Sequence, residues 1–291
     1  MERYQAVTFD NDCDIYQYNL ECKISRGMLI EAHLADLHFN AFDPAEQYKI
    51  LMEQPYEIMA QMPKLDIISI NGDTYDTKML ASSDGVRYAI MFIDKLVDLC
   101  RDKNATLVIV LGTSGHDANQ LKLFYRYMED PSVDVRVVTR IQFEYIKGAK
   151  ILCIPELAGV DDNVYSHFLL YSGLYDSVFM HGTFEGSSYA PSANCKLFNI
   201  TDFVNCTGPI ISGHVHKPGC FNKYFYYCGS PYAWRFDDDH QKGFLIVAHN
   251  LDTGAHYCQF EPIRSFKYET IELDNIVNED PRIVIDYINK L

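Results

Sequence analysis

An apolar run that stops at a glycine and is followed at once by an aspartate constrains this chain more than any other stretch. Residues 65–70 are largely aliphatic, which is typical of a buried β-strand, and the run ends at Gly72 with Asp73 next in line. In open α/β sheets, ligands and metals are held at the carboxyl ends of the strands. A carboxylate in that position can bridge two divalent cations, because each of its oxygens can face a different ion. The stretch therefore predicts an α/β fold that carries a two-metal site.

Histidine and aspartate stand at the ends of other apolar runs as well. Four further segments have this form: Asp36-Leu37-His38, Gly115-His116-Asp117, Met180-His181-Gly182 and Gly213-His214-Val215-His216. Any one of them occurs by chance, and a buried histidine bonded to the backbone explains a single case equally well. All five in one chain, each at a predicted strand end, favour one common site over five accidents.

The order of the predicted elements favours a sandwich of two sheets. Apolar runs and helical periodicity predict strands over 28–34, 65–70, 106–111, 133–139, 150–155, 177–180 and 209–212, and helices over 43–62 (broken at Pro55), 85–103, 118–128 and 161–174. Three late strands, 224–227, 244–249 and 257–260, follow one another without helices and are expected to pair antiparallel. Strands that first alternate with helices and then run alone fit a two-sheet α/β sandwich better than one doubly wound parallel sheet.

Length and composition are those of one large domain. The chain has 291 residues, and a hydrophobic content of 48% is enough to fill a sizeable core. We expect a single domain over 1–261, with short lead-in strands in 1–27 and a tail over 262–291 that contains a short helix. The start of the chain leads into acidic sequence, and no apolar run reaches membrane-spanning length, so we expect a cytoplasmic protein that does not enter a membrane.

The net charge of −15 limits the partners that this chain can bind alone. An acidic surface repels a bare phosphate backbone, and the sequence contains no lysine- or arginine-rich run that would form a nucleic-acid-binding stripe. Metal ions at the strand ends would offset the negative charge locally. Unaided tight binding to nucleic acid is therefore not expected.

Taken together, the series D-x-H, G-D-x-x-D, x-H-D, H-G and G-H-x-H resembles the calcineurin-like metallophosphoesterase superfamily. Within it, the chain is most similar to the SbcD-type DNA repair nucleases and their bacteriophage relatives, over roughly residues 28–250. The resemblance implies a four-layer α/β/β/α sandwich of two mixed sheets flanked by helices. It also implies that Asp36, His38, Asp73 and His216 hold one metal and that Asp73, His181 and His214 hold the other.

The chain departs from the family pattern in one motif. Where the family has an asparagine before a histidine, this chain has Gly112-Thr113-Ser114-Gly115-His116-Asp117. A hydroxyl oxygen of Thr113 or Ser114, or a water molecule, can take the place of the amide oxygen, so we count Ser114 among the candidate ligands. By the resemblance, His116 is a catalytic residue that assists the leaving oxygen, and Asp117 orients His116.

The resemblance implies a metal-dependent phosphodiester hydrolase, a DNA exonuclease or endonuclease subunit in which two metals activate a hydroxide. The mixed oxygen and imidazole ligands suit Mn²⁺, with Fe or Zn as alternatives. The implied partners are DNA, an SbcC-like ATPase that supplies the grip on DNA, and a second copy of the chain. Two alternatives stay open: a stand-alone phosphodiesterase for small or cyclic nucleotides, and a non-catalytic binding subunit.

Overall fold

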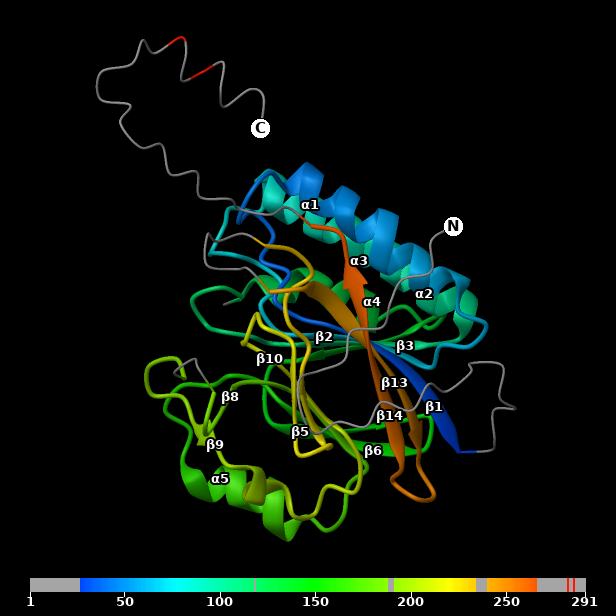
Figure 1. Ribbon diagram of the computed structural model, residues 1–291, viewed down its shortest axis with the longest axis vertical. Coiled ribbons are helices and arrows are strands. Elements are labelled where there is room, and N and C mark those ends of the chain that lie inside the picture. The colour runs from blue at the N-terminus through cyan, green and yellow to red at the C-terminus, as the bar shows by residue number, and fades with distance from the viewer. Residues whose placement is uncertain are drawn as a thin grey trace.

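The computed structural model describes residues 27–117, 119–187, 191–233 and 240–265, together with Arg282 and Ile285. Two six-stranded mixed sheets face each other, and helices cover the outer face of each (Figure 1). The predicted two-sheet α/β sandwich flanked by helices is thus confirmed. The predicted lead-in strands lie outside the described residues, as does all of the C-terminal tail except 262–265, Arg282 and Ile285.

The first sheet has the strand order β14-β13-β1-β2-β3-β4. Strands β1 to β4 run parallel, and β13 and β14 extend the sheet antiparallel beside β1. Their bounds are β1 Met28–Leu34, β2 Ile67–Asn71, β3 Thr106–Val110, β4 Asp134–Val138, β13 Lys242–Asn250 and β14 His256–Ile263. Every residue of β2 and β3 is buried, as expected for strands covered on both faces.

The second sheet has the strand order β11-β12-β10-β7-β6-β5. Its bounds are β5 Gln142–Ile146, β6 Ala149–Ile154, β7 Ser177–His181, β10 Ile210–Gly213, β11 Gly219–Phe221 and β12 Phe225–Tyr227, with a separate small pair β8 Thr183–Phe184 and β9 Leu197–Phe198. Strands β6, β7, β10 and β12 are parallel. Each sheet therefore brings a row of parallel carboxyl ends to one edge.

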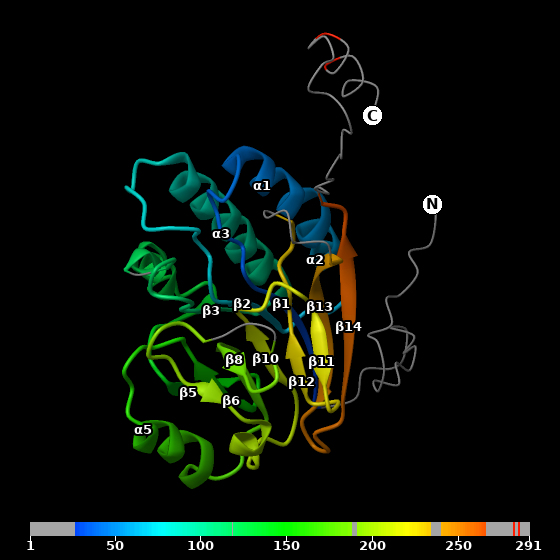
Figure 2. The same ribbon diagram turned by 60° about the vertical axis from the view of Figure 1, so that its left-hand side comes forward.

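Helices lie on both outer faces of the sandwich. Figure 2 shows α1 (Pro44–Leu51), α2 (Glu57–Gln61) and α3 (Asp84–Lys103) on one side and α5 (Asp162–Ser166) on the other. The Asp43 carboxylate caps α1 by accepting from the amide of Ala45, and Pro44 occupies its first turn. The predicted break at Pro55 is a π-helical turn, Met52–Tyr56, that separates α1 from α2.

Apolar side chains fill three layers, one under each set of helices and one between the sheets. Alternation along β3 shows how the sequence divides them: Leu107 and Ile109 pack under the helices, whereas Val108 and Val110 face the other sheet. In the middle layer they meet Cys153 and Phe179 from β6 and β7. The sheets are thereby held face to face with their parallel strand ends at one edge.

Three local predictions differ from the structure. The helix predicted over 118–128 is a 3₁₀ turn, Gln120–Phe124, followed by the single α-turn α4, Tyr125–Met128. Strand β5 was not predicted and forms a hairpin with β6. The three late strands do not form one antiparallel unit, because β12 pairs parallel with β10 in the second sheet while β13 and β14 belong to the first.

Within the described part of the chain, no helix has the length and apolar character needed to cross a membrane.

Candidate metal centre

The predicted site residues lie where the parallel strand ends of the two sheets meet. Asp36 and His38 follow β1, Asp73 follows β2, and the segment 112–117 follows β3. From the second sheet, His181 is the last residue of β7, and His214 and His216 follow β10. Seven of these side chains belong to groups whose nitrogen and oxygen atoms lie within 4.8 Å of one another in each group: Asp36, His38, Asp73, His116, His181, His214 and His216. His116 belongs to a group with His38 and Asp76.

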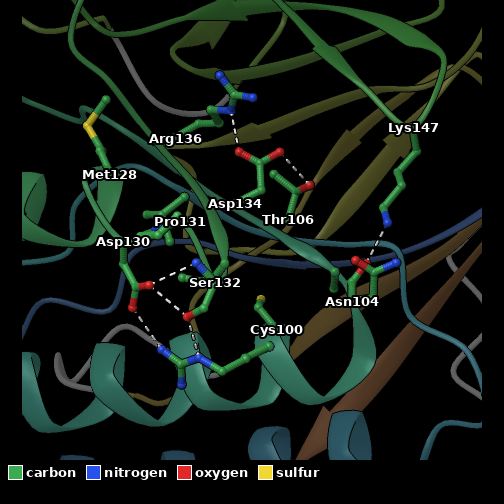
Figure 3. A pocket seen from close by; sticks show the side chains of 14 residues that line it. Cys100, Asn104, Thr106, Met128, Asp130, Pro131, Ser132, Asp134, Arg136 and Lys147 are labelled. Carbon is green, nitrogen blue, oxygen red and sulfur yellow. Dashed lines mark hydrogen bonds and ion pairs between the residues drawn. The ribbon is translucent and has the colours of Figure 1, made fainter.

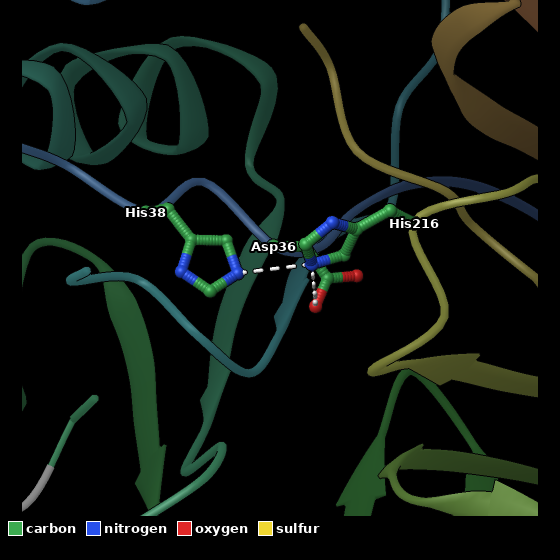
Figure 4. Close-up of side chains that lie close together, drawn as sticks. All are labelled: Asp36, His38 and His216. Atoms are coloured by element: carbon green, nitrogen blue, oxygen red, sulfur yellow. Dashed lines mark hydrogen bonds and ion pairs between the residues drawn. The ribbon is translucent and has the colours of Figure 1, made fainter. Parts of the chain in front are cut away.

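Asp36, His38 and His216 form one such group, shown in Figure 4. The Nε2 atoms of the two histidines are 3.2 Å apart, and His216 Nε2 is 4.0 Å from Asp36 Oδ1. Asp36 Oδ1 accepts from the His214 amide, whereas Oδ2 is buried and has no hydrogen-bond partner in the described chain. Converging imidazole nitrogens beside a buried carboxylate oxygen in need of a partner are a donor set that suits a divalent cation.

Asp73 occupies the centre of the cluster. Its Oδ2 lies 3.2 Å from His181 Nε2 and 3.8 Å from His38 Nε2, so the carboxylate contacts histidines from both sheets. Its Oδ1 accepts from the amide of Thr113 at 2.6 Å. This is the position that the sequence predicts for a bridging ligand.

The ring orientation of His181 is fixed by a hydrogen bond on the side facing away from the cluster. Its Nδ1 donates to the carbonyl of Asn71, on β2, at 2.8 Å. The other nitrogen, Nε2, therefore faces Asp73 and the interior of the cluster. A backbone carbonyl that holds the far nitrogen of a histidine is the usual support of a metal ligand.

His214 and Glu156 complete a further group with His181. Glu156 is the second residue after β6, and its Oε1 lies 3.8 Å from His214 Nδ1. The hydroxyl of Thr113 donates to Glu156 Oε2 at 2.7 Å and lies 3.4 Å from His181 Nε2. Glu156 was not predicted from the sequence, although it has the same placement after an apolar strand as the predicted residues.

The predicted residues His116 and Ser114 of the segment 112–117 lie in different surroundings. His116 Nδ1 donates to the backbone carbonyl of Asp76, and its ring packs edge-on against His38 with centroids 4.7 Å apart. Ser114 is exposed and belongs to none of the groups, so the hydroxyl that the structure brings to the cluster is that of Thr113. The exposed side of the centre is formed by Ser114 with the partly exposed His116 and His214.

The resemblance implied that Asp117 orients the His116 ring. In the structure, the Asp117 carboxylate bonds to backbone amides and not to that ring. This carboxylate is fully buried and accepts from three backbone amides, those of Gly112, Asp73 and Tyr75, at 2.8 to 3.1 Å. It therefore holds the loop after β2 against the loop after β3. The carbonyl of Asp76 is what fixes His116.

Four of the candidate ligands have strained backbones. Asp36, His38, Asp73 and His214 have φ values of 52°, 41°, 51° and 81°, in the left-handed region that residues with a side chain seldom adopt. Such conformations persist only where the surrounding structure enforces them, and they are concentrated at functional sites. Their occurrence at four ligand positions supports the assignment of this edge as the functional site.

Two glycines let the loops approach closely enough for the cluster to form. A Cβ on Gly112 would lie 2.1 Å from the Asp73 amide nitrogen. A Cβ on Gly213 would lie 2.2 Å from the carbonyl oxygen of Asn71, 2.8 Å from His181 Nδ1 and 2.9 Å from Ala35 Cβ. Real Cβ atoms do not tolerate the shortest of these contacts, so both positions require glycine.

The electrostatics of the cluster favour the binding of a cation. Burial raises the pKa of the Asp36 carboxyl to about 8 and holds the pKa of His38 well below its usual value of 6.5. Burial also acts to lower the pKa of His181, but the neighbouring Asp73 carboxylate outweighs it and raises that pKa to about 10. Neutral His38 has the form that binds a metal, and the protons on Asp36 and His181 are those that a metal ion would displace.

A cavity of about 610 Å³ lies at the other end of the first sheet, where β3 and β4 begin (Figure 3). Arg101 pairs with Asp130 at 3.1 Å, Arg136 pairs with Asp134 at 2.6 Å, and Lys147 donates to a backbone carbonyl at the end of α3. The lining cations are thus already matched by acceptors of the protein. This cavity has no feature of a metal or phosphate site.

No known protein family matches this chain, and no curated protein sequence matches it. Among solved structures, a crystal structure has a TM-score of 0.48 at 12% identity and covers 81% of this chain and 100% of its own. A solution NMR structure of a Thermotoga maritima protein has a TM-score of 0.34 at 12% identity and covers 81% of this chain and 99% of its own. Likenesses this distant identify neither a family nor an activity.

Proposed function

We propose that this chain is a metal-dependent phosphodiester hydrolase that holds two divalent metal ions. We expect the ions to be Mn²⁺, with Fe or Zn as alternatives. One observation carries the proposal: four carboxylates and five imidazoles converge from the strand ends of two sheets in overlapping groups that share Asp36, His38 and His181. Groups that share members extend farther than the ligands of a single ion. Two ions about 3.5–4 Å apart are a recurrent arrangement in enzymes that cleave phosphate esters.

Asp36, His38 and His216 would hold one ion, His181 and His214 the other, and Asp73 would contact both. Bound ions of this kind acidify water and neutralise charge on phosphoryl oxygens. His116, partly exposed beside His38 and fixed through Nδ1, presents Nε2 as the atom that gives a proton to the departing oxygen. The buried ligands keep bulk water out, and the substrate approaches over Ser114, His116 and His214.

DNA is the substrate that we propose first, because the motif series resembles that of SbcD-type nucleases. The net charge of −15 argues that DNA is gripped by a partner, such as an SbcC-like ATPase, rather than by this chain alone. The same charge favours the second candidate, a phosphodiesterase for small nucleotides, since a small diester needs no extended basic surface. A binding subunit without catalysis is the third candidate.

The first experiment is Mn²⁺-dependent cleavage of end-labelled single- and double-stranded DNA and of bis-p-nitrophenyl phosphate. We expect hydrolysis by the wild-type chain and a loss of at least about a hundredfold in Asp73→Ala, because that change removes the carboxylate between the two histidine sets. The control is Asp130→Ala, which removes an exposed carboxylate at the opposite end of the sheet and should leave the rate unchanged.

The outcomes separate the candidates. Cleavage of DNA that is lost in Asp73→Ala supports the nuclease, and cleavage of the small diester alone supports the phosphodiesterase or a nuclease that needs its ATPase. Bound Mn²⁺ with no hydrolysis of either substrate would leave only the binding subunit. A chain that binds no metal would contradict the proposal altogether.

A further inference from the structure

Glu156, like the predicted ligands, lies at the carboxyl end of a parallel strand. It stands two residues after β6, a parallel strand next to β7, and its side chain is 3% exposed. Its amide donates to the carbonyl of Leu111 at 3.3 Å, so the end of β6 in one sheet is tied to the end of β3 in the other. The carboxylate is therefore held at the line where the two sheets meet.

The two carboxylate oxygens of Glu156 have different surroundings. Oε2 accepts from the hydroxyls of Thr113 and Ser192 at 2.7 and 2.9 Å. Oε1 accepts from the Ser192 amide at a longer 3.3 Å and lies 3.8 Å from His214 Nδ1. In the described chain, no lysine or arginine nitrogen lies within 4.0 Å of this carboxylate. A buried negative charge with only hydroxyl, amide and imidazole neighbours is costly unless a cation accompanies it.

The spacing of Glu156, His181 and His214 suits a single ion. One oxygen of the carboxylate and one nitrogen of each ring lie within 4.8 Å of one another. Ligand atoms about 2.0–2.2 Å from an ion lie at most about 4.4 Å apart, so a small side-chain rotation closes the set. The ring of His181 is already oriented by its bond to Asn71, which leaves Nε2 on the side of the cluster.

We propose that Glu156 is a metal ligand, and that its carboxylate binds the ion held by His181 and His214. The proposal rests on the proposed function and adds to it the composition of the second ion's ligands: two imidazoles, the shared Asp73 and a second carboxylate. An anionic oxygen binds a divalent cation more tightly than a hydroxyl does, and it shifts the preference of that position toward oxygen-seeking Mn²⁺. Thr113, which donates to Glu156, then orients the ligand instead of binding the ion.

The competing role for Glu156 is purely structural, because it also joins the loops that carry Thr113 and Ser192. Two substitutions separate the roles. Glu156→Gln keeps the shape and most hydrogen bonds but removes the charge. Ser192→Ala removes one of the hydrogen bonds and keeps the charge. If Glu156 binds the ion, the affinity for the metal falls in Glu156→Gln and is kept in Ser192→Ala. If Glu156 only joins the two loops, both substitutions change the affinity to the same extent.

The experiment is calorimetric titration of the metal-free protein with Mn²⁺, together with its unfolding temperature with and without the ion. We expect two bound ions in the wild type. In Glu156→Gln one ion stays and the other weakens at least about tenfold, since even residues that only support a ligand cost 10- to 100-fold. Ser192→Ala should bind both ions. The matched control is Glu144→Gln, a buried carboxylate on the edge strand β5 beside Arg136, which should also bind both.

A Glu156→Gln protein that binds both ions with wild-type affinity would overturn this inference and leave the proposed function standing. A wild-type protein that binds no ion would overturn both. If Glu156→Gln and Ser192→Ala lose affinity to the same extent, Glu156 only joins the two loops and is not a ligand. The unfolding temperatures without metal show whether each variant is folded, so a loss of affinity is not confused with a loss of structure.

Discussion

His116 lies on the partly exposed side of the cluster, and its Nδ1 is bonded to the carbonyl of Asp76, as that of the buried His181 is to the carbonyl of Asn71. The His116 ring stands edge-on to His38, beside a proposed metal position but on the exposed side of it. That placement suits a group that exchanges a proton with substrate better than one that encloses an ion.

We therefore expect His116→Ala to lower turnover by about a hundredfold, within the range typical of general acid catalysis, with two Mn²⁺ ions still bound. The measurements are the rate on bis-p-nitrophenyl phosphate and the metal content of the same preparation. A substrate with a better leaving group should recover part of the lost rate, because its departing oxygen needs no proton. Loss of a metal ion on this substitution would make His116 a ligand and contradict its role as a proton donor.

Single residues also show what the sequence could and could not reveal. The predicted ligands were found because each lies directly after an apolar strand, which is a local pattern. Glu156 follows a strand too, but no histidine accompanies it, and its partners Thr113, Ser192 and His214 are distant along the chain. Only the closed fold brings them together.

The role of Asp117 was wrong for a different reason. Its position next to His116 in the sequence suggested contact, but the amides of both residues donate to the carbonyl of Thr113 in a tight turn. The side chain of Asp117 is directed inward to three backbone amides, while His116 reaches the surface. Adjacent residues of a tight turn can therefore direct their side chains to different partners.

At the scale of the elements, β1 carries a charged group into the space between the sheets. Glu31 and His33 are both fully buried, and His33 Nε2 lies 3.0 Å from Glu31 Oε2. His33 Nδ1 also lies 2.7 Å from the Ser69 hydroxyl on β2, and His249 of β13 lies 3.9 Å from the other Glu31 oxygen. The three neighbouring strands of the first sheet are thus joined by one buried polar network.

This network predicts a specific acid sensitivity. Burial acts to raise the pKa of Glu31, but the neighbouring His249 and the hydrogen-bonded His33 outweigh it and lower the pKa from 4.5 to about 2. A carboxyl with a lowered pKa stabilises the fold above its unfolded value, so the contribution is complete above pH 4.5 and is lost as the pH falls toward 2. A shift of this size corresponds to about 3 kcal/mol.

The measurement is the free energy of unfolding in urea between pH 6 and pH 2. We expect Glu31→Gln to be less stable than the wild type at pH 6 and to lose less stability on acidification. Equal slopes for wild type and Glu31→Gln would show that the network does not hold this charge in the folded state.

The element boundaries were largely predictable, and the pairings only in part: β13 and β14 pair antiparallel as predicted. Strands such as β1 and β3 and the helix α3 are indicated by apolar runs and helical spacing, and their observed bounds agree with the predicted ones within about two residues, the usual uncertainty of helix and strand ends. Strand β12 was found as a strand but assigned to the wrong neighbours, because its parallel pairing with β10 depends on packing between distant parts of the chain. Sheet membership is a property of the whole fold.

At the scale of the whole molecule, the candidate metal centre joins two halves. Asp36, His38 and Asp73 come from the first sheet, and His181, His214 and His216 come from the second. An ion bound to residues of both would oppose their separation. Metal binding should therefore stabilise the complete fold and not just the loops that contact the ion.

We expect Mn²⁺ to raise the unfolding temperature by several degrees, because a ligand at a hundredfold excess over its Kd adds about 2.7 kcal/mol to the stability of the folded state. A chelator should reverse the rise. Asp73→Ala should show little of it, while Asp130→Ala should match the wild type. An unfolding temperature indifferent to Mn²⁺ in the wild type would mean that the centre does not bind the ion in the folded protein.

Gly213 lets the two sheets approach each other closely at the candidate metal centre, and none of the candidate ligands has this role. A ligand can be exchanged for another donor: a hydroxyl, an amide or a carboxylate can each present an oxygen to an ion. No such exchange exists at position 213, where a single added carbon would collide with the Asn71 carbonyl oxygen on the facing sheet and with His181. A residue with no side chain is thus among the least replaceable ones at the site, because the missing Cβ lets one half of the molecule come this close to the other.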